Sequence, residues 1–281
     1  MKLAFSTLGC PNWELERIAQ AAHAFGYEGV ELRALGGDLD LLNRSEFRPE
    51  AVESTRRWFT DRDLAVCCVD SSCTFDSPDD NERRRQIDVA IKHCELAAKL
   101  DSPLVRVFPD RIPAGVTREQ TRDNIALSLN EVAKSCPDSV HVALETHGDF
   151  ARGEAAAEIV RLAAHPNVAL IWDVANALNA GDSIAESASC VSPYLAHVHL
   201  RDARSIPGRE HWHPVLAGRG SVSFQRAVDE LLRLQYEGYI CFEWEKYWQP
   251  DIEDPEIALP DFANAMKKIL AKDGSRASSM A

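Results

Sequence analysis

Short apolar runs alternate with amphipathic stretches along this chain, and that alternation restricts the fold more than any other feature of the sequence. The apolar runs are expected strands, and they lie at 2–6, 29–33, 64–70, 104–108, 140–146, 168–173, 195–200 and 239–244. The stretches with helical spacing lie between and after them, at 13–25, 49–62, 81–100, 118–135, 154–163, 224–235 and 255–270. Strands that alternate with helices indicate a parallel sheet with crossover connections.

Eight such strands in 281 residues favour an α/β fold of one domain, the (β/α)8 TIM barrel, whose usual length is ~250 residues. The alternative is a doubly wound open sheet, but no GxGxxG follows the first strand to support a dinucleotide-binding version. We expect the barrel to occupy 1–271. The last residues, 272–281, are small and polar and are expected to form a disordered tail. A long loop at 201–222 follows the seventh strand, where barrel active sites are built.

The net charge of the chain restricts its possible binding partners, and its cysteines indicate the cellular compartment. A formal net charge of -13 disfavours binding to nucleic acid, because phosphates are repelled by an acidic surface. No segment approaches the ~20 apolar residues of a membrane helix, and the apolar run at the N-terminus is too short for a secretory signal. The 8 cysteines are scattered, so we expect reduced, mostly buried thiols in a cytoplasmic protein with no membrane partner.

The phase of the last four strands predicts the candidate site. Side chains alternate between the two faces of a strand, and in a barrel one face points inward. In each of these strands one phase is apolar and suits the helix layer, as Val142 and Leu144 do in the fifth strand. The other phase ends in a side chain that can bind a metal; these are Glu145, Asp173, His199 and Glu243. We expect the four to converge at the C-terminal mouth of the barrel.

Three carboxylates packed together in a barrel mouth would repel one another and lose hydration, and one divalent cation removes both problems. A donor set with mainly oxygen atoms favours Mn2+, Mg2+ or Co2+, and Zn2+ also fits. Each residue alone has a simpler interpretation: Glu145 or Glu243 as a charge at the rim, Asp173 as a helix N-cap, and His199 as a hydrogen-bonded core histidine. The four on one phase of adjacent strands favour the metal.

Other polar side chains share the inward phase. His147 and Arg106 are expected to bind substrate hydroxyls or a carboxylate. Glu31 and Arg33 on the second strand either do the same or form an ion pair inside the barrel mouth. Glu245 is expected to be a charge at the rim.

Several stretches of the sequence resemble the motifs of one family. FGYEGVELR and LVRVFPD resemble the signatures of its second and fourth strands, and LAGRGSVSF resembles the end of its seventh loop. The stretches VALETHGD, WDVAN, HVHLRDAR and GYICFEWE carry the four metal-capable residues in order. On these residues nearly the whole chain resembles the xylose isomerase-like TIM barrel superfamily, with its sugar phosphate isomerase/epimerase family.

This resemblance implies a metal-dependent isomerase or epimerase of a sugar, keto-sugar or sugar phosphate in carbohydrate metabolism. Glu145 and Glu243 would transfer a proton through a metal-bound enediolate. It also implies a small carbohydrate as partner, manganese or a similar ion as cofactor, and a homo-oligomer.

One departure concerns the sixth strand, where the family often has a substrate-contacting His three residues after the metal Asp. Here that position holds Asn176, which can hydrogen-bond a hydroxyl but cannot become cationic. An arginine that follows the metal His in some epimerases corresponds to Arg201 or Arg204. Two alternatives stay open: a dehydratase of a cyclic keto-polyol, of the inosose or dehydroshikimate type, and a non-catalytic sugar-binding barrel. An endonuclease IV-like role is disfavoured by the acidic charge and the few histidines.

Overall fold

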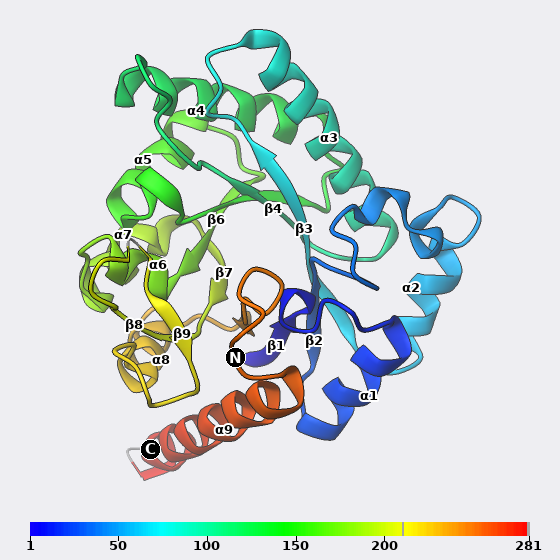
Figure 1. The fold of residues 1–281 in the computed structure, drawn as a ribbon, viewed down its shortest axis with the longest axis vertical. Coiled ribbons are helices and arrows are strands. Elements are labelled where there is room, and N and C mark those ends of the chain that lie inside the picture. The colour runs from blue at the N-terminus through cyan, green and yellow to red at the C-terminus, as the bar shows by residue number, and fades with distance from the viewer. Residues whose placement is uncertain (210, 280–281) are drawn as a thin grey trace.

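Eight parallel strands close into a barrel in the computed structural model (Figure 1). In order around the ring they are β1 (Lys2–Ser6), β10 (Tyr239–Phe242), β7 (Leu195–His199), β6 (Val168–Asp173), β5 (His141–Glu145), β4 (Leu104–Phe108), β3 (Ala65–Thr74) and β2 (Gly29–Leu32). The structure describes residues 1–209 and 211–279, with side chains described for 1–209 and 211–271. The single-domain (β/α)8 barrel expected from the alternation is confirmed.

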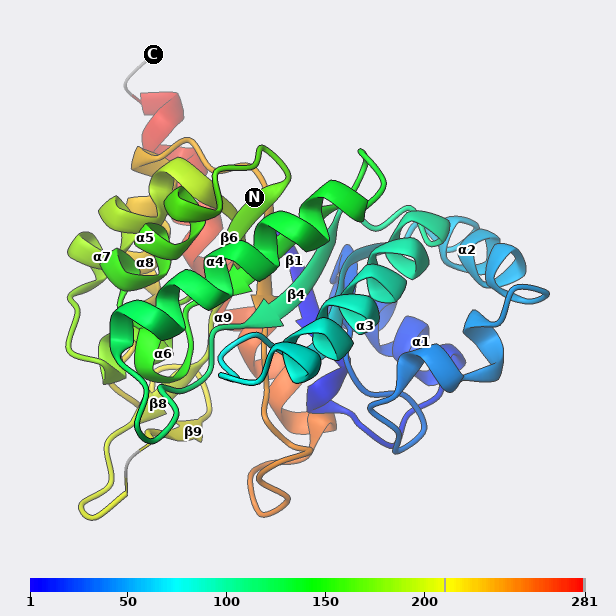
Figure 2. The same ribbon diagram turned by 90° about the horizontal axis from the view of Figure 1, so that it is seen from above.

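Helices surround the strands on the outside, as the two views in Figure 1 and Figure 2 show. They are α1 (Leu15–Phe25), α2 (Val52–Thr60), α3 (Asp80–Lys99), α4 (Arg118–Ser135), α5 (Gly153–Ala163), α6 (Val174–Asn179), α7 (Ile184–Val191), α8 (Phe224–Arg233) and α9 (Pro255–Ser279). The last helix contacts both α8 and α1, so the outer layer closes like the sheet inside it. No helix of the described residues is both long and apolar enough to cross a membrane.

Local sequence signals explain where several helices begin and end. Thr117 and Gln120 form a capping box at the start of α4, and Ser183 and Glu186 form another at the start of α7. These pairs satisfy backbone N–H groups that a helix leaves free at its first turn. Gly26 ends α1 with a φ of 76°, a left-handed conformation that glycine adopts without strain.

Two connections are more regular than the sequence suggests. The segment between β6 and β7 contains two short helices, α6 and α7, followed by a 3-10 turn at Ser192–Tyr194. The long loop 201–222 contains an antiparallel pair of strands, β8 (Asp202–Arg204) and β9 (His213–Val215). The helices and strands in both segments are short and mixed in polarity, so none of them shows a clear helical or strand period in the sequence.

The expected boundary between the barrel and a disordered tail at 272–281 stays a prediction. The backbone of α9 is described as helical as far as Ser279, within that tail, and residues 280–281 lie outside the described residues.

The strand phases divide the apolar side chains into separate clusters. The large cluster between barrel and helices holds Val142, Leu144, Leu170, Trp172 and Phe242. Two small clusters lie inside the barrel: one joins Cys68, Leu104, Ala143, Ala169 and Ile171, and the other joins Ala4, Cys67 and Cys241. The inward and outward assignments made from the sequence are therefore confirmed for the last four strands. Small and apolar residues fill the base of the barrel, which leaves its mouth for polar side chains.

One expectation about the cysteines is wrong. Cys94 on α3 and Cys136 at the end of α4 form a disulfide across 42 positions of the sequence, with Cα atoms 5.6 Å apart. The neighbouring helices α3 and α4 pack together and bring the two sulfur atoms face to face, which spacing along the chain does not reveal. The other six cysteines are free, and five of them are buried.

Candidate metal centre

Four side chains from four adjacent strands meet at the C-terminal mouth of the barrel. Each offers one donor atom, and these atoms lie within 4.8 Å of one another; the residues are Glu145, Asp173, His199 and Glu243. Strand pairing sets this convergence, because Asp173 lies beside His199 and His199 lies beside Cys241, two residues before Glu243. All four are buried, with at most 4% of the residue exposed.

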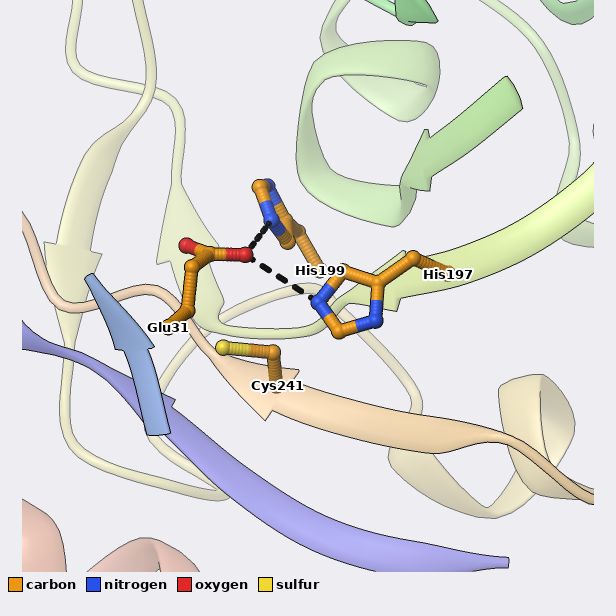
Figure 3. Close-up of side chains that lie close together, drawn as sticks. All are labelled: Glu31, His197, His199 and Cys241. Carbon is orange, nitrogen blue, oxygen red and sulfur yellow. Dashed lines mark hydrogen bonds and ion pairs between the residues drawn. The ribbon is translucent and has the colours of Figure 1, made fainter. Parts of the chain in front are cut away.

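His199 is held by a carboxylate on the side away from this cluster (Figure 3). Its Nε2 lies 2.8 Å from Oε2 of Glu31, and Nε2 of His197 lies 3.1 Å from the same oxygen. Burial alone would raise the pKa of Glu31, but the two imidazoles, His199 above all, hold that pKa well below its usual value. The ionised carboxylate of Glu31 accepts a hydrogen bond from Nε2–H of His199, and Nδ1 is the nitrogen that faces the other carboxylates.

Nδ1 of His199 is buried and has no aligned hydrogen-bond partner among the described residues. Oε2 of Glu243 lies 3.4 Å away and Oε2 of Glu145 lies 3.8 Å away. A buried nitrogen without a partner costs free energy unless something binds it. A metal ion held by these oxygens would be that partner, and a carboxylate behind a ligating histidine is typical of metal sites. The residues present therefore fit a divalent cation.

Asp173 has two functions in one side chain. Its Oδ1 accepts a hydrogen bond of 2.8 Å from the backbone N–H of Asn176 and caps α6, as the simpler interpretation of the sequence suggests. Its Oδ2 points to the cluster and contacts Arg201. Thr146 accepts a bond of 2.8 Å from the Asp173 backbone N–H and fixes the end of β6. One carboxylate oxygen thus remains for a metal after the helix is capped.

Two buried arginines contact the same carboxylates. Nη1 of Arg106 donates to Oε2 of Glu145 at 3.1 Å and to Oε1 of Glu243 at 2.9 Å. Nη1 of Arg201 contacts Asp173 and donates to Oε2 of Glu243 at 3.0 Å. Sequence reasoning expected both side chains to bind substrate, but in the structure each is also a counter-ion of the cluster.

The charges of this region do not balance without a further cation. Five carboxylates and three arginines are buried here among the described residues; they are Glu31, Asp70, Glu145, Asp173 and Glu243, and Arg33, Arg106 and Arg201. With neutral imidazoles, these buried carboxylates exceed the buried arginines by two charges, and the partly exposed Glu245, which pairs with Arg201, adds one more. One divalent ion would offset two of these charges.

Burial and neighbouring charges shift the pKa values of three groups in this cluster upward. Burial, opposed by Arg201, raises the pKa of Asp173 to about 6. Burial also raises the pKa of Asp70 well above its usual value. For His199 burial lowers the pKa, but Glu31 and Glu243 outweigh it and raise the pKa well above its usual value. Each of these shifts favours the protonated form of its group, which makes the cluster less negative.

Two neighbouring cavities, of about 360 and about 550 Å³, open beside the cluster. Glu145, Glu243 and Arg106 line the smaller cavity, and Arg201 lines the larger one. His147 and Asn176 line both cavities. Asp173 and His199 line neither, so they lie behind the two glutamates.

Glu31 also lines neither cavity and is fully buried. Its place is behind His199 rather than against a substrate, although it was expected among the substrate-binding residues. Its expected ion pair with Arg33 is absent from the described contacts: Oε2 of Glu31 faces the two imidazoles, and its buried Oε1 has no hydrogen-bond partner among the described residues.

Asn176 bridges two residues of the site. Its Nδ2 donates to Oε1 of Glu145 at 3.3 Å, and its Oδ1 accepts from Nη2 of Arg201 at 3.1 Å. The amide therefore orients one carboxylate and one guanidinium, a function that needs a donor and an acceptor on the same side chain.

Sequence reasoning gave no role to two residues of the cluster, His197 and Asp70, and expected a third, Glu245, only as a charge at the rim. His197 shares Glu31 with His199, Asp70 lies 3.3 Å from Arg106, and Glu245 pairs with Arg201 at 2.9 Å. His197 and Asp70 follow the inward phase of β7 and β3, so strand alternation contained a signal for both.

Comparisons with known proteins agree with the barrel fold. The family model described as "Xylose isomerase-like TIM barrel" matches residues 19–268. An uncharacterized protein of Escherichia coli (strain K12), YihM, is 24% identical over 257 residues, which is 85% of this chain and 72% of YihM.

Among solved structures, the IolI protein with a bound zinc atom has a TM-score of 0.82 at 18% identity, over 97% of this chain and 99% of that one. An L-ribulose 3-epimerase has a TM-score of 0.80 at 13% identity, over 100% and 98% of the two chains. At such identities these similarities show the shared fold.

Proposed function

Because this chain belongs to the xylose isomerase-like TIM barrel family, we propose that it is a divalent-metal-dependent isomerase or epimerase of a keto-sugar or a related polyhydroxylated carbonyl compound. The observation that carries this proposal is the convergence of Glu145, Asp173, His199 and Glu243 beside a cavity that both glutamates line. These four residues would hold the ion, with His199 binding through Nδ1. When bound, a divalent ion polarises a carbonyl group and stabilises the negative charge that develops when the neighbouring C–H loses its proton.

Glu145 and Glu243 are the proposed proton-transfer residues. Both carboxylates reach the same cavity, so one can remove a proton from the carbon beside the carbonyl while the other returns it. Burial would raise the pKa of Glu243, but His199 and the two arginines hold it well below its usual value. Glu243 is therefore ionised before substrate binds, as a general base must be.

The remaining polar groups of the cavities would orient the substrate. His147 lies on the wall of both cavities, with its ring centroid 4.7 Å from that of Phe108. Asn176 and Arg201 present an amide and a guanidinium on the wall of the larger cavity. We propose that these three side chains bind hydroxyl groups of a small carbohydrate.

One observation favours a second candidate, a sugar-binding barrel without turnover. Each carboxylate oxygen of Glu145 and Glu243 is already hydrogen-bonded to Arg106, Arg201 or Asn176. A metal must displace some of these bonds, whereas a binding protein could keep them all.

The test measures metal content and solvent proton exchange together. The purified protein, loaded with Mn2+, Mg2+ or Co2+, is incubated in D2O with a panel of ketoses and inososes, and deuterium incorporation is followed by NMR. We expect exchange at the carbon beside the carbonyl in at least one compound. Loss of water from an inosose would indicate the dehydratase instead.

The variants Glu145→Gln and Glu243→Gln should each lower exchange by about 100-fold or more, the usual contribution of a general acid or base. Glu237→Gln, a carboxylate just before β10 and away from the cluster, serves as the matched control. A protein that takes up no divalent ion would contradict the proposal. Metal uptake and sugar binding without exchange of any compound would favour the non-catalytic barrel.

A further inference from the structure

Arg33 is the one buried arginine of the barrel mouth that has no carboxylate within ion-pair distance among the described residues. It follows β2, and only 3% of it is exposed. Its Nη2 donates to Oγ of Ser72 at 2.8 Å, and its Nη1 is buried with no hydrogen-bond partner in the described structure. Arg106 and Arg201 differ sharply from it, since each lies within ion-pair distance of three carboxylates.

A buried guanidinium without a counter-ion is costly, because the charge has lost water and gained no partner. Burial, followed by repulsion from Arg106, lowers the pKa of Arg33 to about 10. The group therefore stays charged at neutral pH in spite of that cost. Asp70, Glu145 and Glu243 attract it only from a distance, since none of them lies within ion-pair range.

Arg33 lines the same cavity of about 360 Å³ as Glu145 and Glu243. Ser72 and Thr74 of β3 line it as well and add two hydroxyl groups. The metal-capable residues come from β5, β6, β7 and β10, which form one half of the ring, whereas Arg33 and the hydroxyls come from β2 and β3 in the other half. A molecule in this cavity therefore meets the proton-transfer carboxylates and an unpaired cation at the same time.

We propose that the substrate is a polyhydroxylated acid, and that its carboxylate pairs with Nη1 of Arg33 and the hydroxyl of Ser72 while its carbonyl end faces Glu145 and Glu243. The inference rests on the proposed function and narrows it from neutral ketoses to keto-acids of the sugar-acid class. A carboxylate fits better than a phosphate dianion, because the described residues of β2 and β3 on this side of the cavity offer one unpaired guanidinium nitrogen and two hydroxyls. The same cavity is also lined by Asp110, Glu145, Glu243 and Glu245, which would repel a second negative charge.

The test compares three unreactive ligands that share one carbon skeleton: ribitol, D-ribonate and ribitol 5-phosphate. Their affinities for the metal-loaded protein are measured by isothermal titration calorimetry. Ribonate should bind about tenfold or more tightly than ribitol, because a hydrogen bond to a charged group contributes at least that much. Arg33→Met should remove this preference and change the affinity for ribitol by less than about twofold, while Arg33→Lys should retain part of it.

Arg161→Met is the matched control, because Arg161 is an exposed arginine in the last turn of α5 and lines neither cavity. It loses the same charge and should keep the preference for ribonate. Thermal denaturation supplies a second measurement: since Arg33→Met removes an unpaired buried charge, the variant should melt no lower than the wild type. A purely structural arginine would give a lower melting temperature and an unchanged preference.

Equal binding of ribonate and ribitol to the wild type would overturn the proposal, and so would tighter binding of ribitol 5-phosphate than of ribonate. Metal content of the same samples separates the two proposals. A wild type that holds its metal but shows no preference for the acid contradicts only the substrate class. A wild type that binds no metal contradicts the proposed function.

Discussion

Nε2 of His199 lies 2.8 Å from Oε2 of Glu31, while Nδ1 of the same ring faces Glu145 and Glu243. The pair fixes which nitrogen carries the proton and which one is directed at the candidate metal centre. Glu31 is therefore a positioning residue for His199, and it lies outside both cavities.

Replacing Glu31 by Gln should weaken metal binding without removing a ligand. The amide keeps the shape of the side chain but loses the charge that holds the proton on Nε2 of His199. We expect the dissociation constant for Mn2+ to rise about 10- to 100-fold, as for other residues behind metal ligands. Equilibrium dialysis with metal analysis measures this dissociation constant for the wild type and the variant. Asp182→Asn removes another buried carboxylate, one that pairs with Arg152, and should leave the constant unchanged.

Metal removal and replacement should change the thermal stability. A ligand present at about 100 times its dissociation constant stabilises the folded state by about 2.7 kcal/mol. For a chain of this size that corresponds to a rise of about 5 to 10 °C in Tm when Mn2+ is added after dialysis against a chelator. His199→Ala should abolish the rise. His141→Ala should retain the rise in Tm, because His141 begins β5 at the end opposite Glu145. A wild type with the same Tm in both conditions would argue against the metal centre.

His93 should make stability depend on pH. Only 5% of this residue is exposed, and burial lowers its pKa below the ordinary value. Below about pH 6.5 the unfolded chain gains a proton that the folded chain resists, so the free energy of unfolding falls as the pH decreases through that value.

The slope from this group is at most about 1.4 kcal/mol per pH unit. Urea unfolding at pH 5, 6, 7 and 8 measures the free energy of unfolding of the wild type and of His93→Gln. The wild type should lose more stability between pH 7 and 5 than the variant does. His23→Gln, at an exposed histidine on α1, should follow the wild-type curve. Parallel curves for the wild type and His93→Gln would rule out this contribution.

The disulfide between Cys94 and Cys136 predicts a thiol count. The unfolded, unreduced protein should react with six equivalents of a thiol reagent, and with eight after reduction. Cys136→Ala should lower the free energy of unfolding by about 2 to 4 kcal/mol, because the unfolded chain regains the freedom that the bond restricts. Cys190→Ala, at a half-buried free cysteine, is the control. Eight reactive thiols before reduction would show that the bond does not form.

The periodicity of the sequence determined the barrel and most of the candidate metal centre. Strand alternation assigned Glu145, Asp173, His199 and Glu243 to one face of four strands, and the parallel barrel brings the C-terminal ends of those strands together. Such an inference is local, since each side chain's direction follows from its place in its own strand. Capping residues such as Thr117 and Asp173 are readable from the sequence for the same reason.

Only the tertiary structure decided which charges pair with which. Glu31 on β2 and Arg33 just after it lie two residues apart, yet Glu31 binds two histidines from β7 and Arg33 reaches Ser72 on β3. The lengths and rotamers of side chains that cross the barrel set those distances, and so does the packing of α3 on α4 that joins Cys94 to Cys136. These contacts connect residues far apart in the chain, and no periodic pattern records them because their geometry depends on all eight strands at once.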